Sequence, residues 1–242
     1  ARGVEIVGAR IRGVRALVAL GLGYCFLAAG CSSASQKVPH VPPRDVFVSA
    51  EQVCPELFAG GGAKALGRIL DSSEFRIRDE KRSASADAAA RAMARAYRAG
   101  KGVRDSSQPE CEVSGPVQEI GDSRAWPTAV LRFTASSKLG DTGLPERAPG
   151  ISFTVAGADA YLGFDCVSAQ VGSTAAIPLT ISIGFDDHWT PRKGTPDGSE
   201  HPKELAAVLH SAATSVARKL ECSENGGLPA RSEDLKAVPP RK

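Results

Sequence analysis

The first thirty residues constrain the fold most, because they resemble a segment that is exported and removed rather than one that folds. Four arginines, Arg2, Arg10, Arg12 and Arg15, precede an uncharged apolar run over residues 16–29. Small residues end this run and lead directly to Cys31. A basic start, a short apolar run and a small-residue cleavage site are the three parts of an export signal. The run is shorter than the roughly 20 residues that span a bilayer. We therefore expect residues 1–30 to be a signal peptide.

The residues at the expected cleavage site resemble the lipobox of bacterial lipoproteins, in which small residues precede a cysteine. Ala29, Gly30 and Cys31 match this motif, whereas Ala28 stands where leucine is commoner and Leu27 lies one residue further out. The resemblance implies that the Cys31 thiol carries a diacylglyceryl group, which attaches the protein to the extracytoplasmic face of the cell membrane. Two or more acyl chains hold a protein stably on a bilayer. An uncleaved membrane helix and an ordinary secretion signal are the alternatives.

The charge of the chain argues against nucleic acid as a partner. The chain has 30 Lys and Arg against 27 Asp and Glu, a net charge of +3. The first thirty residues contain four arginines and one glutamate, so this excess lies entirely in the segment that we expect to be removed. Nucleic-acid binding depends on a basic patch or stripe. A neutral mature chain gives no such indication.

Four cysteines remain once Cys31 is assigned to lipid, namely Cys54, Cys111, Cys166 and Cys222. An even number of cysteines in an oxidising compartment predicts two disulfides. Three pairings are possible, and we favour Cys54–Cys111 with Cys166–Cys222 because each would join a helix to a neighbouring strand region. None of these cysteines is spaced C-x-x-C, so the pattern does not predict a zinc site or a thioredoxin-like centre.

The mature chain divides into three parts by composition. Residues 31–45 contain three prolines among small polar residues, which predicts a lipidated cysteine followed by a flexible tether. Residues 46–222 hold all the apolar periodic segments and predict a single ectodomain. Residues 223–242 are rich in Gly, Pro and charge, which predicts a flexible C-terminal tail.

The ectodomain is predicted to be an α+β domain with a mainly antiparallel sheet and about three helices. A capping-box pattern, Ser49 to Gln52, predicts a first helix, and apolar periodicity predicts helices over 63–70, 85–99 and 202–221. Alternating apolar residues predict strands over 74–78, 111–113, 129–135, 151–155, 160–167 and 177–185. The strands follow one another too closely for helical crossovers, which favours antiparallel pairing.

The densest polar cluster is Asp186-Asp187-His188, followed by Trp189. Carboxylates and imidazole are metal and acid–base groups. Neighbouring residues of an extended chain point to opposite faces, however, so a strand-end turn with Trp189 packed on the domain is the favoured interpretation.

Three other features are better explained by structure than by chemistry. The glycines of Gly60-Gly61-Gly62-Ala63-Lys64 lack the spacing of a phosphate-binding loop and predict a joint between helices. His210 lies beside the apolar stripe of the last helix. The arginines of the middle helix, Arg91, Arg95 and Arg98, could meet an acidic partner, but a solvated helix face is the usual explanation. We predict no catalytic residue, no metal ligand and no cofactor.

Two stretches of the ectodomain, Tyr161–Ser168 and Leu220–Pro229, resemble actinobacterial lipoproteins of unknown function, especially those of streptomycetes. The resemblance implies a cell-envelope α/β domain and carries no catalytic residues. A PsbP-like α-β-α sandwich is one fold that it suggests.

These observations together predict a non-enzymatic module that binds an envelope protein or a small ligand. The alternative is an envelope hydrolase or metal-dependent enzyme that uses Asp186, Asp187 and His188. A sensor or accessory subunit of a transporter or kinase is a third possibility.

Overall fold

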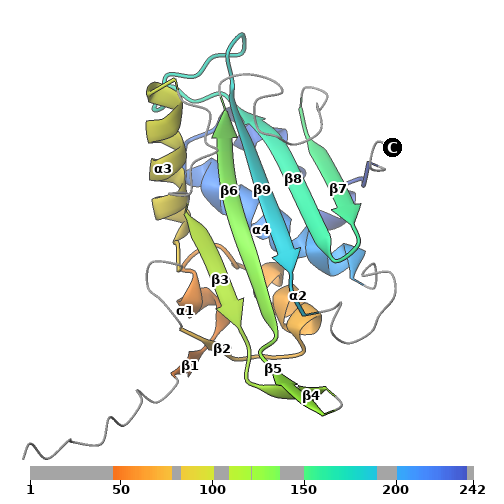
Figure 1. Ribbon diagram of the computed structural model, residues 1–242. Coiled ribbons are helices and arrows are strands. Elements are labelled where there is room, and N and C mark those ends of the chain that lie inside the picture. The colour runs from red at the N-terminus through yellow and green to blue at the C-terminus, as the bar shows by residue number, and fades with distance from the viewer. Residues whose placement is uncertain are drawn as a thin grey trace, which may run out of the picture. The chain divides into compact units, whose positions relative to one another are not determined.

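One antiparallel sheet of seven strands organises the protein in the computed structural model (Figure 1). The structure describes residues 46–77, 83–100, 109–120, 122–136, 150–189 and 201–238. The signal peptide, Cys31 and the tether that the sequence predicts therefore lie outside the described residues. Residues 43–242 form one compact unit.

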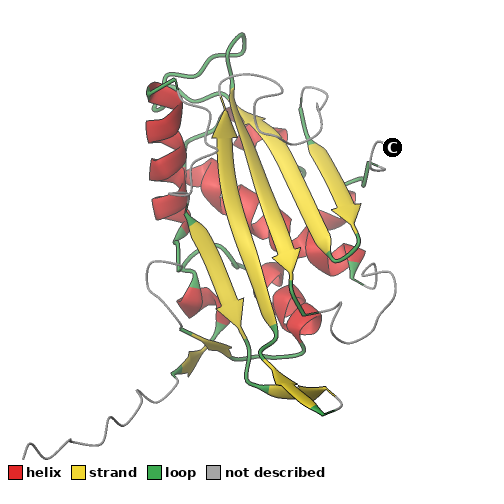
Figure 2. Cartoon of the chain, viewed as in Figure 1, coloured by secondary structure: helices red, strands yellow, loops and turns green. Residues whose placement is uncertain are grey.

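Strands distant in sequence lie side by side in this sheet, whose order is β1-β2-β3-β6-β9-β8-β7. The strands are β1 (Phe47–Val48), β2 (Phe75–Arg76), β3 (Glu110–Ser114), β6 (Thr128–Ser136), β7 (Ser152–Ala156), β8 (Asp159–Cys166) and β9 (Leu179–Asp187). A separate hairpin of β4 (Gln118–Ile120) and β5 (Ser123–Ala125) extends beyond the end of the sheet (Figure 2). The predicted antiparallel α+β class is confirmed.

Alternation along the central strands produces one apolar and one polar face. In β6, Leu131 and Phe133 are fully buried, whereas the intervening Arg132 is exposed. In β9, Ile181 and Ile183 are likewise buried against the helices. Successive side chains of a strand point to opposite faces, so this pattern defines the face on which helices must pack.

Four helices cover the apolar face within the described ranges (Figure 1). They are α1 (Ala50–Val53), α2 (Gly61–Leu70), α3 (Ala86–Arg98) and α4 (Pro202–Lys219). Pro202 opens α4 at a position where its missing N–H costs nothing. Ser85 caps α3 by accepting a hydrogen bond from the Ala88 N–H at 3.1 Å, as the sequence predicts. An α-β-α sandwich would carry helices on both faces, whereas the described helices lie on one.

Both disulfides form in the favoured pairing, Cys54–Cys111 and Cys166–Cys222. The first joins the end of α1 to β3, and the second joins the end of β8 to the residues after α4. Their sequence separations are 57 and 56 residues. Cross-linking loops of that length removes about 4 kcal/mol of chain entropy from the unfolded state, in the loop-closure model.

The segment after Cys222 differs from the predicted flexible tail. It contains short 3-10 helices over Ser223–Gly227 and Ser232–Asp234. Leu228 is buried, and the Val238 N–H donates to Phe153 O at 2.7 Å on the outer edge of β7. The Gly, Pro and charge content of this segment predicts a flexible tail, but burying a leucine contributes about 1.5–3 kcal/mol and favours the packed arrangement.

The start of β9 also differs from its predicted position. Ile177 was expected to begin the strand, but it lies in a turn closed by hydrogen bonds with Thr174 and is 56% exposed. Pro178 follows and has no N–H to donate, so the strand begins at Leu179.

None of the helices in the described ranges combines the length and the apolar character that crossing a bilayer requires.

Candidate functional site

The side chains of Asp186, Asp187 and His188 diverge. Asp186 lies on the polar face of the sheet and forms an ion pair with Arg132. Asp187 is buried on the other face, where its Oδ1 accepts the Trp189 N–H at 2.7 Å. His188 is exposed, and Trp189 is fully buried. The strand-end turn with a packed Trp189 is confirmed, and the three side chains do not converge on one ligand.

Arg132 is the centre of a charged row across the polar face. Its Nε donates to Glu110 Oε1 at 3.1 Å on β3, while its other side meets Asp186 on β9. The ring of Tyr161 lies over Gly184, where an added Cβ would come within 3.1 Å of the ring. Burial raises the pKa of Tyr161, and the charge of Asp159 raises it further, while Arg132 lowers it. These cross-strand pairs neutralise one another, as in many solvated sheet faces.

Metal ligands and a histidine base find no support in the described ranges. No group of three or more His, Cys, Asp and Glu side chains there is arranged to hold a metal ion. His210 donates from Nε2 to Pro229 O at 2.7 Å, so its ring holds the C-terminal segment against α4. This agrees with its interpretation as a boundary histidine.

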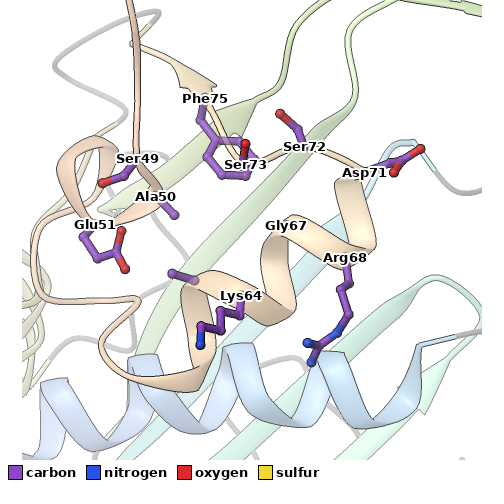
Figure 3. A pocket seen from close by; sticks show the side chains of 11 residues that line it. Ser49, Ala50, Glu51, Lys64, Gly67, Arg68, Asp71, Ser72, Ser73 and Phe75 are labelled. Atoms are coloured by element: carbon purple, nitrogen blue, oxygen red, sulfur yellow. The ribbon is translucent and has the colours of Figure 1, made fainter.

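A pocket of about 620 Å³ lies instead between α1, α2 and the turn that follows α2 (Figure 3). Ser49, Ala50 and Glu51 form one side, and Lys64, Gly67 and Arg68 of α2 form the lower edge. Its remaining lining residues are Ala63, the turn residues Asp71, Ser72 and Ser73, and Phe75 of β2. Three separate segments of the chain therefore build it.

The charges in this pocket are of both signs. Glu51 and Lys64 are exposed and have no ion-pair or hydrogen-bond partner in the part of the chain that the structure describes. Arg68 points towards α4, where its Nε donates to Glu204 Oε1 at 3.0 Å (Figure 3). One carboxylate and one ammonium group thus remain available to a ligand.

Local contacts hold the walls of the pocket in place. The Ser49 N–H donates to Gln52 Oε1 at 3.2 Å, which fixes the start of α1 as the capping box predicts. Val53, in the last turn of α1, is buried, and the neighbouring Cys54 is bonded to Cys111 of β3. A helix of four residues is not stable alone, so these attachments determine its position.

The glycines before α2 bring that helix close to α4. Gly60 has a φ of +65°, a conformation that glycine adopts without strain. At Gly62 an added Cβ would lie 2.7 Å from Ser211 Cβ on α4. The Ser211 hydroxyl also donates to Leu57 O and Ala59 O, each at 2.9 Å. The predicted joint between helices is confirmed, and it packs tightly.

Sequence patterns do not indicate that these residues form a pocket. Ser49 belongs to a capping-box pattern and Lys64 to a glycine-rich segment, and neither pattern predicts a binding site. The turn Asp71–Phe75 is separated from Ser49 by the whole of α2, and single-sequence patterns do not predict which segments meet in three dimensions. Acid and base residues on exposed helix turns are also too common to mark a site.

Comparison with known proteins identifies no relative: no family model, no curated protein and no solved structure matches the chain. The two stretches that resemble actinobacterial lipoproteins are joined in the structure. Cys166 is bonded to Cys222, and the Ser223 N–H donates to Val167 O at 2.8 Å. The resemblance itself stays a prediction.

The contact between α2 and α4 predicts different outcomes for two adjacent glycines. Gly62→Ala should lower the free energy of unfolding by about 1–3 kcal/mol, because its methyl group displaces Ser211. Gly61→Ala has no atom within 4 Å of the added Cβ and should be neutral or slightly stabilising. Urea denaturation of both variants measures the difference. Equal effects of the two changes would contradict the close packing.

Proposed function

We propose that this protein is a lipid-anchored extracytoplasmic binding module, attached to the cell membrane through Cys31, whose pocket between α1 and α2 takes a small ligand. The single observation that carries the binding role is the pocket itself, a ligand-sized recess with one unpaired charge of each sign. The lipidated position is supported by the lipobox resemblance alone. An accessory role beside another envelope protein is compatible with the same arrangement.

The size and lining of the pocket favour a small zwitterionic ligand. Ligand pockets generally enclose about 300–1,000 Å³ and combine apolar walls with a few polar groups. Here Ala50, Ala63 and Phe75 supply apolar surface, and Phe75 is almost fully buried. Lys64 suits a carboxylate, and Glu51 suits an ammonium group. An amino acid or a short peptide with free ends carries both.

The hydroxyl groups in the pocket favour binding over catalysis. A serine nucleophile requires an adjacent base within hydrogen-bond reach. Ser72 Oγ instead donates to Glu74 O at 2.6 Å and accepts the Glu74 N–H at 3.2 Å, so it closes the turn. The divergence of Asp186, Asp187 and His188 leaves the proposed enzymatic alternative without the convergent geometry that it would need.

The ligand class can be tested with the dipeptide alanyl-alanine and a version blocked at both ends. Calorimetric titration should detect the free dipeptide, and Lys64→Met or Glu51→Gln should weaken its binding about tenfold, because each removes one charge partner. Glu119→Gln changes an exposed carboxylate on β4 and is the matched control. Equal binding of the blocked dipeptide, or no loss in either pocket variant, would contradict the proposed ligand.

The lipid attachment has its own test. Cys31→Ala in the full chain, expressed in a bacterium fed a labelled fatty acid, should abolish incorporation of label and release the protein from the membrane fraction, because the acceptor thiol is gone. The control variant is Cys25→Ala. Because Cys25 lies in the expected signal peptide, this change should leave labelling intact. Continued labelling of Cys31→Ala would show that the attachment site is wrong.

A further inference from the structure

The arginines of α3 line a second recess, together with a cation from a distant part of the chain. A groove of about 380 Å³ runs between α3 and the end of α4. Arg91, Arg95 and Arg98 lie on one side, Lys219 of α4 lies on the other, and Leu220 forms part of the lining. The sequence predicts a solvated helix face for these arginines, but the fold places a fourth cation opposite them.

The charges of this groove are only partly compensated. Arg91 forms an ion pair with Asp87, and Lys219 Nζ donates to Glu56 Oε1 at 2.9 Å. Arg98 donates to a neutral backbone oxygen, Gln170 O, at 2.8 Å. Arg95 is exposed and has no partner among the described residues. Two guanidinium groups therefore keep their charge uncompensated by carboxylates in the described ranges.

The walls of the groove are held rigidly relative to one another. The Cys166–Cys222 disulfide joins the end of β8, just before the loop that carries Gln170, to the residues after α4. Between them, Ser168 Oγ donates to Leu220 O, so the loop that carries Gln170 is bonded to the end of α4. Tyr97 and Arg98 of α3 donate hydrogen bonds to the segment between β8 and β9. The Tyr97 hydroxyl donates to Ile177 O at 2.7 Å, and Arg98 donates to Gln170 O. A recess whose backbone is held this way has less to order when a partner binds.

The spacing of the arginines matches an extended acidic segment. Side chains three residues apart on a helix have Cβ atoms about 5–6 Å apart, which applies to Arg95 and Arg98. Alternate side chains of an extended peptide are about 6.6 Å apart on one face. Carboxylates at alternate positions can therefore each meet one guanidinium. Ile177, 56% exposed, has its carbonyl bonded to Tyr97 and offers an apolar contact near the groove.

We propose that the groove between α3 and α4 binds an acidic, extended segment of a partner protein, with Arg95 and Arg98 as its principal charge contacts. The inference extends the proposed binding role to a protein partner and uses a surface separate from the α1–α2 pocket. A concave recess beside an exposed isoleucine favours a peptide over a flat anionic membrane surface, because it can take side chains individually.

A labelled octapeptide of alternating glutamate and leucine is the probe, and the same peptide with glutamine in place of glutamate is its control. Fluorescence anisotropy with the full chain, its disulfides intact, should show binding of the acidic peptide that weakens as salt rises. Arg95→Glu should weaken it about tenfold or more, because it reverses a charge in the groove. Arg124→Glu makes the same charge change on the distant β5 and should alter binding less than twofold.

Equal effects of Arg95→Glu and Arg124→Glu would overturn the proposal, as would equal binding of the glutamine peptide. Two other outcomes would assign the groove to phosphate groups instead. One is competition by millimolar inorganic phosphate. The other is absence of peptide binding together with binding to vesicles of anionic lipid that Arg95→Glu abolishes. Dipeptide titration of the same Arg95→Glu protein separates the two proposals. If dipeptide binding is retained while the peptide test fails, only the groove assignment is wrong.

Discussion

Two disulfides fix the ends of short or exposed elements to the sheet, and the α1–α2 pocket and the α3–α4 groove lie beside them. Cys54 ends the short α1 helix whose first turn lines the pocket, and its bond to Cys111 attaches that wall to β3. Cys166 and Cys222 bracket the residues that close the basic groove. The large core of α4 and the central strands would form without these bonds, because its apolar residues are contiguous and fully buried. The four-residue α1 buries only Ala50 and Val53, so its position depends more on covalent attachment.

The same dependence connects the expected location of the protein to its proposed function. A signal peptide at residues 1–30, as the sequence predicts, would place the chain where disulfides persist, and the disulfides would then hold a pocket and a groove in defined shapes. The charge distribution is consistent with this prediction. The net positive charge lies in the first thirty residues, yet the fold gathers four cations of the neutral remainder around one recess. A neutral total therefore does not prevent a locally basic surface.

The sequence predicted the elements better than it predicted the sites. Strands with strict alternation, such as Thr128–Ser136, were predicted within one residue, because burial of one face dictates the pattern. The turn at Ile177 and the packed segment after Cys222 were missed, since a proline and two leucines act there through tertiary contacts. The pocket and the groove each combine segments far apart in sequence. Arg95 and Lys219 have no reason to be associated until α3 and α4 are packed, and Glu51 and Lys64 line one pocket only once α1 and α2 are packed.

We expect each disulfide to hold the wall of one recess rather than the core as a whole. Hydrogen exchange measured under native conditions, comparing the wild-type protein with Cys54→Ala/Cys111→Ala and Cys166→Ala/Cys222→Ala, tests it most directly. Loss of the first disulfide should accelerate exchange of the backbone amides at positions 53 and 54. Loss of the second should accelerate exchange of the amides of Gly172, Ser173 and Ser223. Exchange in β6 and β9 should change least in both variants. A uniform acceleration across walls and core strands alike, or unchanged exchange at the walls, would contradict the account.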